Sequence, residues 1–295
     1  NESQRFFLVT ALQVFASVAV SATNYALHGA VWQPQCQLVK KLRKSARRAR
    51  LHLNSLIDAV TKLTTLKTKL MAFYVMTPPS KNNAIAAALL AAADSELDRI
   101  VARVVDDGKT LVEGVAYSGE IAGALTSFVR VLSTAAEGSN TCLGNGSGGD
   151  GKSTAETNGC SEPAIDSDSG EAEIATADVG EKAFTKLVAK STGTGREKTG
   201  SCGFFKGTSD TASDGGIKFT GGNTYKAVFG LIQQNADDDP TQKPADDLTA
   251  AAGTVLPVYK RAHAAIRALQ LLAQEDYTIN PQAQLKKLAS AAAAV

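Results

Sequence analysis

The chain has 295 residues, and its 31 Lys and Arg nearly balance its 29 Asp and Glu, for a formal net charge of +2 at pH 7. This balance provides no overall field that would favour nucleic acid or an acidic partner. Aromatic residues make up only 6% of the chain, which suits long helices packed through Ala and Leu better than a thick globular core.

The first 22 residues are expected to form a secretory signal peptide. A short polar N-terminal segment ends at Arg5, and a mostly apolar run follows from Phe6 to Val20. Val20, Ser21 and Ala22 then place small residues at positions −3 and −1 of a cleavage site. The alternative is an amphipathic first helix of the mature fold. The run is too short and too polar for a membrane span.

The stretch from Trp32 to Met76 carries a long helical pattern with no Gly or Pro after Pro34. Apolar or small residues recur in steps of three and four, which predicts a heptad seam about 65 Å long that needs a partner helix. The seam residues are Trp32, Cys36, Val39, Leu42, Ala46, Ala49, Leu53, Leu56, Val60, Leu63, Leu66, Leu70 and Phe73.

A turn at Thr77–Asn83, with Pro78 and Pro79, separates this helix from a second helical run. A short turn between two long seams predicts an antiparallel hairpin over residues 35–76 and 84–136. Facing residues are expected to be Leu53, Leu56, Val60 and Leu63 on the first helix and Leu97, Ile100 and Val104 on the second. Gly108, Gly114, Gly119 and Gly123 each cost the second helix about 1 kcal/mol, and they loosen it or allow a close backbone approach.

Composition changes at Gly138, since most of the chain's 25 glycines lie between residues 138 and 222. We expect loops and short elements held by cysteines, with one short helix near 179–189. Further helices are predicted at Thr224–Gln234 and Asp246–Gln274, with Pro257 as a kink or restart. The seam of the last helix comprises Tyr259, Ala262, Ile266, Leu269 and Ala273. The Ala-rich end from Leu285 to Val295 is compatible with a helix.

The predicted fold class is therefore mainly α. A long antiparallel helical hairpin forms a rod (31–137), a Gly-rich loop lobe linked by disulfides follows (138–222), and returning helices pack on the rod (223–295).

Four cysteines, Cys36, Cys142, Cys160 and Cys202, suggest two disulfides in a secreted chain, with three possible pairings. Cys142 and Cys160 bracket a loop without packing residues of its own, so we predict that they pair. The hairpin returns the chain to the end of the rod where Cys36 lies, which leaves Cys202 as its partner. A zinc site is not expected, because no CxxC occurs and His28, His52 and His263 lie far apart in the sequence.

Residues Gly146–Ser153 match the phosphate-binding pattern GxxxxGK[ST] letter by letter. The context argues against nucleotide binding, because no hydrophobic strand precedes the match and no apolar helix follows it. Asn145, Gly146 and Ser147 form an N-glycosylation sequon in the same loop, so Asn145 is the glycosylation candidate.

A basic run, whose members are Lys40, Lys41, Arg43, Lys44, Arg47, Arg48 and Arg50, could bind nucleic acid or an anionic surface. Because the seam residues lie between them, a solvated face or pairing with acidic neighbours is the preferred interpretation. Asp237–Asp239 and Asp246–Asp247 lack the spacing of a calcium loop, and Asp246 could cap a helix. No catalytic, cofactor or metal set can be nominated.

The run Trp32-Gln33-Pro34-Gln35-Cys36 opening a long helix, followed by a hairpin and a Gly-rich region with three more cysteines, resembles the class B N-terminal domain of trypanosome variant surface glycoproteins. The resemblance covers about residues 23 to 290 and is most specific around Trp32–Cys36 and in the order of the cysteines. It suggests the same nested disulfide order.

The resemblance implies a non-enzymatic coat glycoprotein on the outer face of the plasma membrane that evades host antibodies by antigenic variation. It also implies a homo-oligomer (dimer or trimer), a glycosylphosphatidylinositol anchor and a Cys-rich C-terminal domain. The sequence contains neither that domain nor an anchor signal. A related surface receptor for a host serum macromolecule is the alternative. A secreted hydrolase is disfavoured because no catalytic set can be assembled.

Overall fold

The computed structural model describes residues 26–78, 81–137, 140–145, 151–160, 174–187, 196–197, 224–234, 240–250, 255–272, 286 and 289–290. The predicted signal peptide therefore lies outside the described residues, as do most of the Gly-rich region and Asp237–Asp239. None of the described helices is long and apolar enough to cross a membrane.

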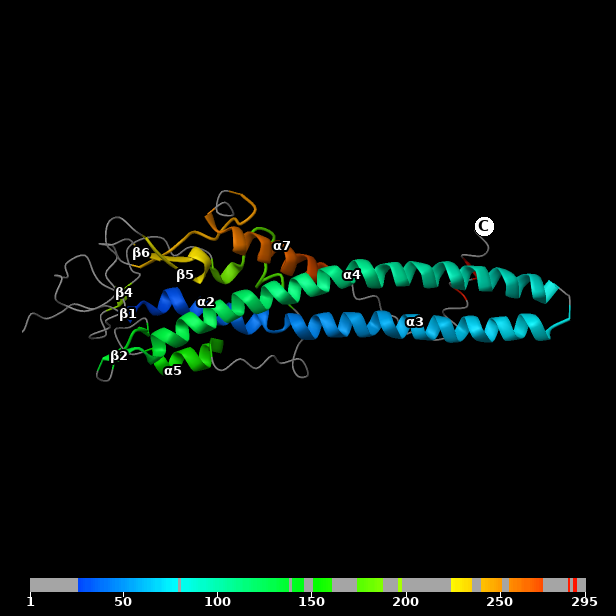
Figure 1. The fold of residues 1–295 in the computed structure, drawn as a ribbon, viewed down its shortest axis with the longest axis horizontal. Coiled ribbons are helices and arrows are strands. Elements are labelled where there is room, and N and C mark those ends of the chain that lie inside the picture. The colour runs from blue at the N-terminus through cyan, green and yellow to red at the C-terminus, as the bar shows by residue number, and fades with distance from the viewer. Residues whose placement is uncertain are drawn as a thin grey trace, which may run out of the picture.

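Three helices build an elongated hairpin, which confirms the predicted fold class (Figure 1). They are α2 (Gly29–Leu42), α3 (Ser45–Met76) and α4 (Lys81–Thr134). Helix α4 has 54 residues and is therefore about 80 Å long. At the end of the rod that is farthest from the N-terminal helix, only α3 and α4 among the labelled elements continue (Figure 1).

The first helix of the hairpin begins earlier than predicted and is divided in two. His28 caps α2, since its Nδ1 accepts a hydrogen bond from Ala30 N at 3.0 Å, and Pro34 lies inside the helix. The break falls at Arg43–Lys44, where the Ser45 hydroxyl donates to the carbonyl of Leu42. In a regular helix that carbonyl would accept the N–H of residue 46, so the serine competes with the helical bond.

The outer half of the rod has a small core of its own between α3 and α4. Leu56, Ala59, Leu63 and Ile100 are buried there, and Val60, Leu97 and Val104 pack against them. The residues predicted to face each other are thus confirmed except Leu53, which is 37% exposed. Of the longer predicted seam, Phe73 is also exposed, at 48%. Leu53 precedes Leu56 by three residues, a turn of about 60° round the helix, which carries it out of the interface.

Helix α7 (Pro257–Leu271) packs on α4 in the inner half of the hairpin. Pro257 stands at the first helical position, where its missing N–H costs no hydrogen bond. Four predicted seam residues, Tyr259, Ala262, Ile266 and Leu269, are fully buried; Ala273 lies outside the described residues. A Cβ added to Gly114 of α4 would stand 2.8 Å from Leu269 Cβ, so this glycine lets α7 approach closely.

The helix predicted at Thr224–Gln234 is wrong. Strands β5 (Tyr225–Ala227) and β6 (Ile232–Gln234) form an antiparallel hairpin there, and β7 (Thr241–Gln242) pairs with β6. Between them, in the short segment η3 (Val228–Gly230), Val228, Phe229 and Gly230 have φ of 52°, 55° and 85°. These left-handed conformations end any right-handed helix, and only Gly230 adopts its positive φ without strain.

The remaining elements of the head are short. They are β1 (Ala26–Leu27) paired with β4 (Arg196–Glu197), β2 (Ala136–Glu137) paired with β3 (Asn140–Thr141), α5 (Lys152–Ala155), η1 (Glu156–Cys160) and η2 (Thr185–Leu187). In the described part of the helix predicted near 179–189, residues 179–187, the helical segment is the single turn η2. In the stretch from Leu285 onward, Lys286, Ala289 and Ser290 are helical.

Changing Leu56 to Asp should lower the free energy of unfolding by several kcal/mol, because an unpaired carboxylate would be buried in the rod core. Asn54→Asp adds the same charge to the same helix at an exposed position and should change stability little. Chemical denaturation of both variants checks the difference. Equal stabilities would contradict the observed packing of the rod.

Changing Gly114 to Ala should destabilise the contact between α4 and α7, because the new Cβ would overlap the Leu269 side chain. Gly119→Ala is the matched control. A Cβ there meets no atom within 4 Å, so alanine should stabilise α4 by up to about 1 kcal/mol. Thermal unfolding should therefore shift in opposite directions for the two variants, and a shared sign would be evidence against the close approach.

Candidate functional site

The head of the molecule is organised around Trp32, in the sequence run that carries the family resemblance. Its indole is fully buried on α2, and its Nε1 donates to the carbonyl of Gly144 at 2.8 Å. The chain then passes over the ring at Gly151, where a Cβ would stand 2.9 Å from Trp32 Cζ2 and 2.7 Å from the Gly144 carbonyl oxygen. Trp32 thus fixes two loop segments that lie more than 110 residues away in the sequence.

Gln33 and Gln35 of the same run extend this network. Gln33 donates to the backbone carbonyl of Asn145 at 3.2 Å. Buried Gln35 donates to the side chain of Gln242, which donates in turn to the carbonyl of Leu187. The motif therefore ties α2 to loops from three distant parts of the chain, which is a structural role.

The phosphate-binding pattern does not have the surroundings that its chemistry needs. Residues 146–150 lie outside the described residues. Gly151 gives its N–H to the carbonyl of Leu143, and α5, which begins at Lys152, has four residues. The Gly151 N–H is therefore not available to a phosphate, and a phosphate-binding loop depends on such backbone N–H groups.

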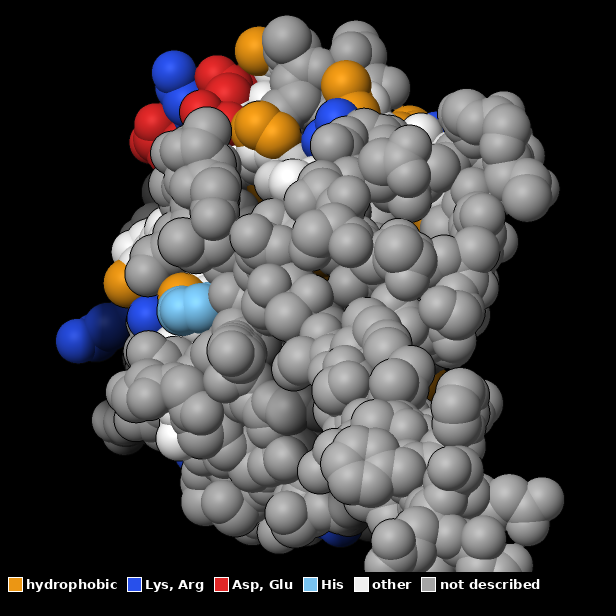
Figure 2. Space-filling view, turned by 90° about the vertical axis from the view of Figure 1, so that its left-hand side faces the viewer, with side chains coloured by type: hydrophobic (Ala, Val, Ile, Leu, Met, Phe, Trp, Pro, Cys, Tyr) orange, Lys and Arg blue, Asp and Glu red, His pale blue; other side chains and the backbone are white. Residues whose placement is uncertain are grey.

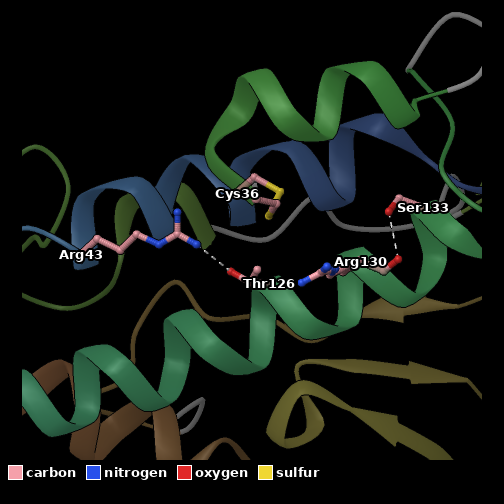
Figure 3. The surroundings of a disulfide bond; sticks show 6 residues. Cys36, Arg43, Thr126, Arg130 and Ser133 are labelled. Atoms are coloured by element: carbon pink, nitrogen blue, oxygen red, sulfur yellow. Dashed lines mark hydrogen bonds between the residues drawn. A yellow bond between two sulfur atoms is a disulfide. The ribbon is translucent and has the colours of Figure 1, made fainter. Parts of the chain in front are cut away.

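A disulfide joins Cys36 to Cys160, with Cα atoms 5.0 Å apart (Figure 3). Both predicted pairs are therefore wrong, because each used one of these two cysteines. The reason is local packing: η1 lies directly on α2, and Gly159, with φ of 105°, fits against the Cys36 carbonyl and the Lys40 side chain. Cys142 is also disulfide-bonded; Cys202 lies outside the described residues.

Most of the basic run is partly buried in the head rather than solvated. Arg48 donates to the carbonyls of Leu269, Gln270 and Leu272 at the end of α7. A cation at a helix C-terminus satisfies free carbonyls and opposes the helix dipole. Arg48 thus holds α7 against α3.

Two neighbours of Arg48 make similar internal contacts. Arg43 reaches Thr126 of α4 at 3.4 Å (Figure 3), and burial lowers the pKa of its guanidinium. Lys41 pairs with buried Asp178 at 3.3 Å. Of the basic run, only Lys40 and Arg50 are exposed, as the interpretation of a solvated face expected. Lys41 pairs with an acidic neighbour, which was the other expectation.

A polar cluster interrupts the rod core where α7 ends. His52 Nε2 lies 2.8 Å from Asp107 Oδ2, and Arg103 donates to the same oxygen at 3.0 Å. The His52 ring is 2% exposed, and its Nδ1 is buried without a hydrogen-bond partner. The cluster joins α3 to α4 through Asp107.

His263 of α7 has a structural environment as well. Its Nε2 donates to the carbonyl of Gly180 at 2.9 Å, and its ring meets the edge of Phe184. Burial lowers the pKa of His263, with a smaller opposing contribution from the Gly180 hydrogen bond. The neutral form that burial favours supports the packing of α7 on residues 180–184.

The acidic residues do not form a metal site in the part of the chain that the structure describes. Within it, no group of three or more His, Cys, Asp or Glu could hold a metal ion. Asp247, not Asp246, caps the local turn by accepting hydrogen bonds from the N–H groups of Thr249 and Ala250. The hydrogen bond from the Thr249 side chain is the main cause that lowers the pKa of Asp247.

Comparison with known proteins gives the family. The family model "Trypanosome variant surface glycoprotein (A-type)" matches residues 7–295. This chain belongs to the trypanosome variant surface glycoproteins. The resemblance noted in the sequence was to class B. This class is corrected, because the family model that matches is A-type.

Two curated variant surface glycoproteins of Trypanosoma brucei brucei are similar over most of the chain. ILTAT 1.24 is 31% identical over 86% of this chain and 50% of its own length. MITAT 1.4A is 28% identical over 90% of this chain and 52% of its own length. The chain thus spans about half the length of the curated relatives it matches.

A solved structure titled "Structure of MITat 1.1" superimposes with a TM-score of 0.64. It is 15% identical in sequence, and the match covers 92% of this chain and 78% of that one. At this identity the likeness supports the fold alone, which agrees with the helical rod described above.

The head end of this variant surface glycoprotein shows no single kind of side chain among its described residues. Viewed along the rod, apolar, basic and acidic side chains and a histidine are all visible (Figure 2). The two arginine contacts that hold the head together, from Arg43 and Arg48, were not foreseen from the sequence. The two arginines are five residues apart and therefore do not share one face of a regular helix, so their spacing in the sequence did not indicate these contacts.

Non-reducing peptide mapping should recover a peptide that links Cys36 to Cys160. Replacing both residues with serine should lower the free energy of unfolding by about 3–5 kcal/mol, because the bond closes a loop with a sequence separation of 124. A Cys36–Cys202 peptide would instead restore the pairing expected from the sequence.

Stability should fall as the pH drops below about 6.5, the ordinary pKa of histidine. Because burial lowers the folded-state pKa of His263, the unfolded chain takes up the proton first, and protonation favours unfolding. The His263→Gln variant keeps a donor for Gly180 but cannot titrate there, so its thermal unfolding should depend less on pH between 7 and 5. An unchanged pH dependence would exclude His263 as its source.

Proposed function

We propose that this chain is the N-terminal domain of a non-enzymatic coat glycoprotein of a trypanosome, which shields the membrane and evades host antibodies by antigenic variation. The observation that carries this proposal is the family match over residues 7–295. Since the chain spans about half the length of its curated relatives, the role refers to the longer parent protein.

The shape of the molecule supports a coat role. A hairpin built on a helix of about 80 Å holds the head away from the tip of the rod, and rods of this kind can pack side by side. The head consists of short elements joined by loops (Figure 1). Loops tolerate sequence change because they contribute little to the core.

The described residues also offer no assembled catalytic set. His52 lies between α3 and α4, where it contacts Asp107. His263 donates a hydrogen bond to the backbone carbonyl of Gly180. The three described cysteines, Cys36, Cys142 and Cys160, are all disulfide-bonded. These placements support a non-enzymatic role.

The proposal includes several features of the parent protein. Residues 1–22 act as a signal peptide, the mature chain begins near Thr23, and Asn145 carries an N-linked glycan. A glycosylphosphatidylinositol anchor attaches the parent to the plasma membrane. The protein forms a homo-oligomer, a dimer or trimer, and host antibodies are its external partners.

Surface labelling of intact cells that express the parent, with and without phospholipase C, tests the location. Labelled protein should be abundant and should be released by the enzyme, whereas intracellular protein that escapes labelling would refute the proposal. A pull-down from serum separates the coat role from the receptor alternative, because a receptor would capture one serum macromolecule stoichiometrically.

N-terminal sequencing of the surface protein tests the signal peptide. The expected first residue is Thr23 or a close neighbour. Protein that retains the segment from Phe6 to Val20 would show that this segment is part of the mature fold.

A further inference from the structure

The end of the rod that lies farthest from the head carries a cluster of exposed apolar side chains. Among the labelled elements, only α3 and α4 reach this end (Figure 1). Val75 and Met76 are 73% and 84% exposed, and Met76 is the most exposed of the large apolar residues that the structure describes. We name this cluster the apolar tip; its members are Met71, Phe73, Tyr74, Val75 and Met76 of α3 and Ile85 of α4.

The apolar tip surrounds the end of α3 rather than following one side of it. Residues 71–76 are consecutive, and every one of them is exposed. At about 100° per residue they point in all directions around the helix axis. A helix that docks on a protein surface buries one apolar stripe and keeps its other sides polar, whereas a helix that is apolar all round is immersed in an apolar medium. The arrangement at the tip therefore favours immersion over docking.

The residues next to the tip carry only positive charge. Between Asp58 on α3 and Asp94 on α4 the sequence has no acidic residue but four lysines, Lys62, Lys67, Lys69 and Lys81. The two aspartates at the borders of this segment pair with Lys62 and Lys67. Lys69 lies beyond these pairs, nearer to the tip, and is exposed. This end of the rod is thus complementary in charge to an anionic surface.

The distance between Lys69 and the tip matches the depth of a lipid headgroup layer. Lys69 and Met76 are seven residues apart, which is about 10 Å along α3. Interfacial protein segments place their apolar side chains about 5–10 Å into the boundary between headgroups and acyl chains. With Met76 at that depth, the Lys69 ammonium lies at the level of the lipid phosphates. Tyr74 combines an apolar ring with a hydroxyl, and tyrosine is enriched at this level of membranes.

The carbonyl groups at the end of α3 already have partners within the protein. Thr77 donates to the Phe73 carbonyl from its N–H at 3.0 Å and from its hydroxyl at 2.7 Å. The Asn83 side chain of α4 donates to the carbonyls of Thr77 at 3.0 Å and Tyr74 at 3.5 Å. A helix end normally leaves such carbonyls to water. Their internal hydrogen bonds lower the cost of moving the turn out of bulk water.

We propose that the apolar tip inserts into the headgroup region of an anionic lipid bilayer, with the rod upright on the membrane and the head pointing away from it. The contact is interfacial, since none of the described helices is long and apolar enough to cross a membrane. This proposal goes beyond the coat role, because it gives the polypeptide itself a direct contact with lipid.

A fluorescent probe at position 76 tests the insertion. The 295-residue chain with Met76→Cys is labelled with an environment-sensitive maleimide, and labelling of the original chain gives the background. Vesicles of phosphatidylcholine and phosphatidylserine should shift the emission to shorter wavelength, and brominated acyl chains should quench it. Val131→Cys is the matched control, because Val131 is exposed on α4 at the head end. Its probe should neither shift nor be quenched.

Vesicle flotation measures the contribution of the apolar side chains. The double variant Val75→Ser and Met76→Ser should bind the same vesicles about tenfold more weakly or worse. The double variant Val112→Ser and Val131→Ser removes two exposed valines away from the tip and should bind like the original chain. Because all variants share residues 1–22, any contribution of that segment is the same in each. Circular dichroism checks that every variant keeps its helices.

A charge reversal tests the role of the lysine. Lys69→Glu should weaken binding to the anionic vesicles about 25-fold, since each charge near such a surface changes affinity about fivefold. Binding to vesicles of phosphatidylcholine alone should change little. Lys260→Glu reverses an exposed charge on α7 and is the matched control, which should leave both affinities unchanged.

Four results would overturn the proposal. They are an unshifted probe at position 76, equal quenching at positions 76 and 131, equal binding by the two double variants, and equal effects of the two lysine reversals. The longer parent protein, tested without a lipid anchor, should give the same shift at position 76. A shift in the 295-residue chain alone would assign the tip to another segment of the parent and would also refute lipid insertion. None of these outcomes bears on the coat role, which surface labelling decides independently.

Discussion

Every other part of this fold depends on α4, because this one helix packs against different partners on different sides. It pairs with α3 through Ile100 in the rod, and it receives α7 at Gly114. The glycine is the constraint that matters most: with any side chain there, Leu269 could not lie where it does. A glycine in the middle of α4 lowers helix stability by about 1 kcal/mol, but it allows α7 to pack closely against α4.

The two hydrophobic cores along α4 are separated by polar side chains. The head core includes Trp32, Leu125 and Tyr259, and the rod core is the small cluster around Leu56. Between them, His52, Asp107 and Arg103 join α3 to α4, and Arg48 holds the end of α7. A buried polar pair adds little net stability, but it disfavours other alignments of two helices. In an otherwise repetitive seam of small apolar residues, such a pair helps to fix the register of the hairpin.

Periodicity predicted the parts of the structure that consist of long helices. The hairpin, its turn near Pro78 and the buried side of α7 follow from spacing alone, since each needs only a continuous apolar seam. The head could not be predicted in the same way. The β5–β6 hairpin occupies a run predicted as helix, because three consecutive residues adopt positive φ at Val228–Gly230, and no periodic pattern indicates this.

The disulfide shows the same limit. Sequence reasoning correctly placed the chain after α4 next to Cys36, but it could not tell which cysteine the local packing brings there. That choice depends on Gly159 and Gly151, which let the backbone lie directly on α2 and on Trp32. Close approach at a glycine is a property of two segments together, and one segment's composition does not reveal it. The family was evident from the Trp32–Cys36 motif, but the motif did not identify the class.

The rod core is small for the length of the hairpin that it supports. Its buried residues are Leu56, Ala59, Leu63 and Ile100, and burying each large side chain contributes only about 2 kcal/mol. The outer half of the rod is therefore the region where the hairpin should open most readily.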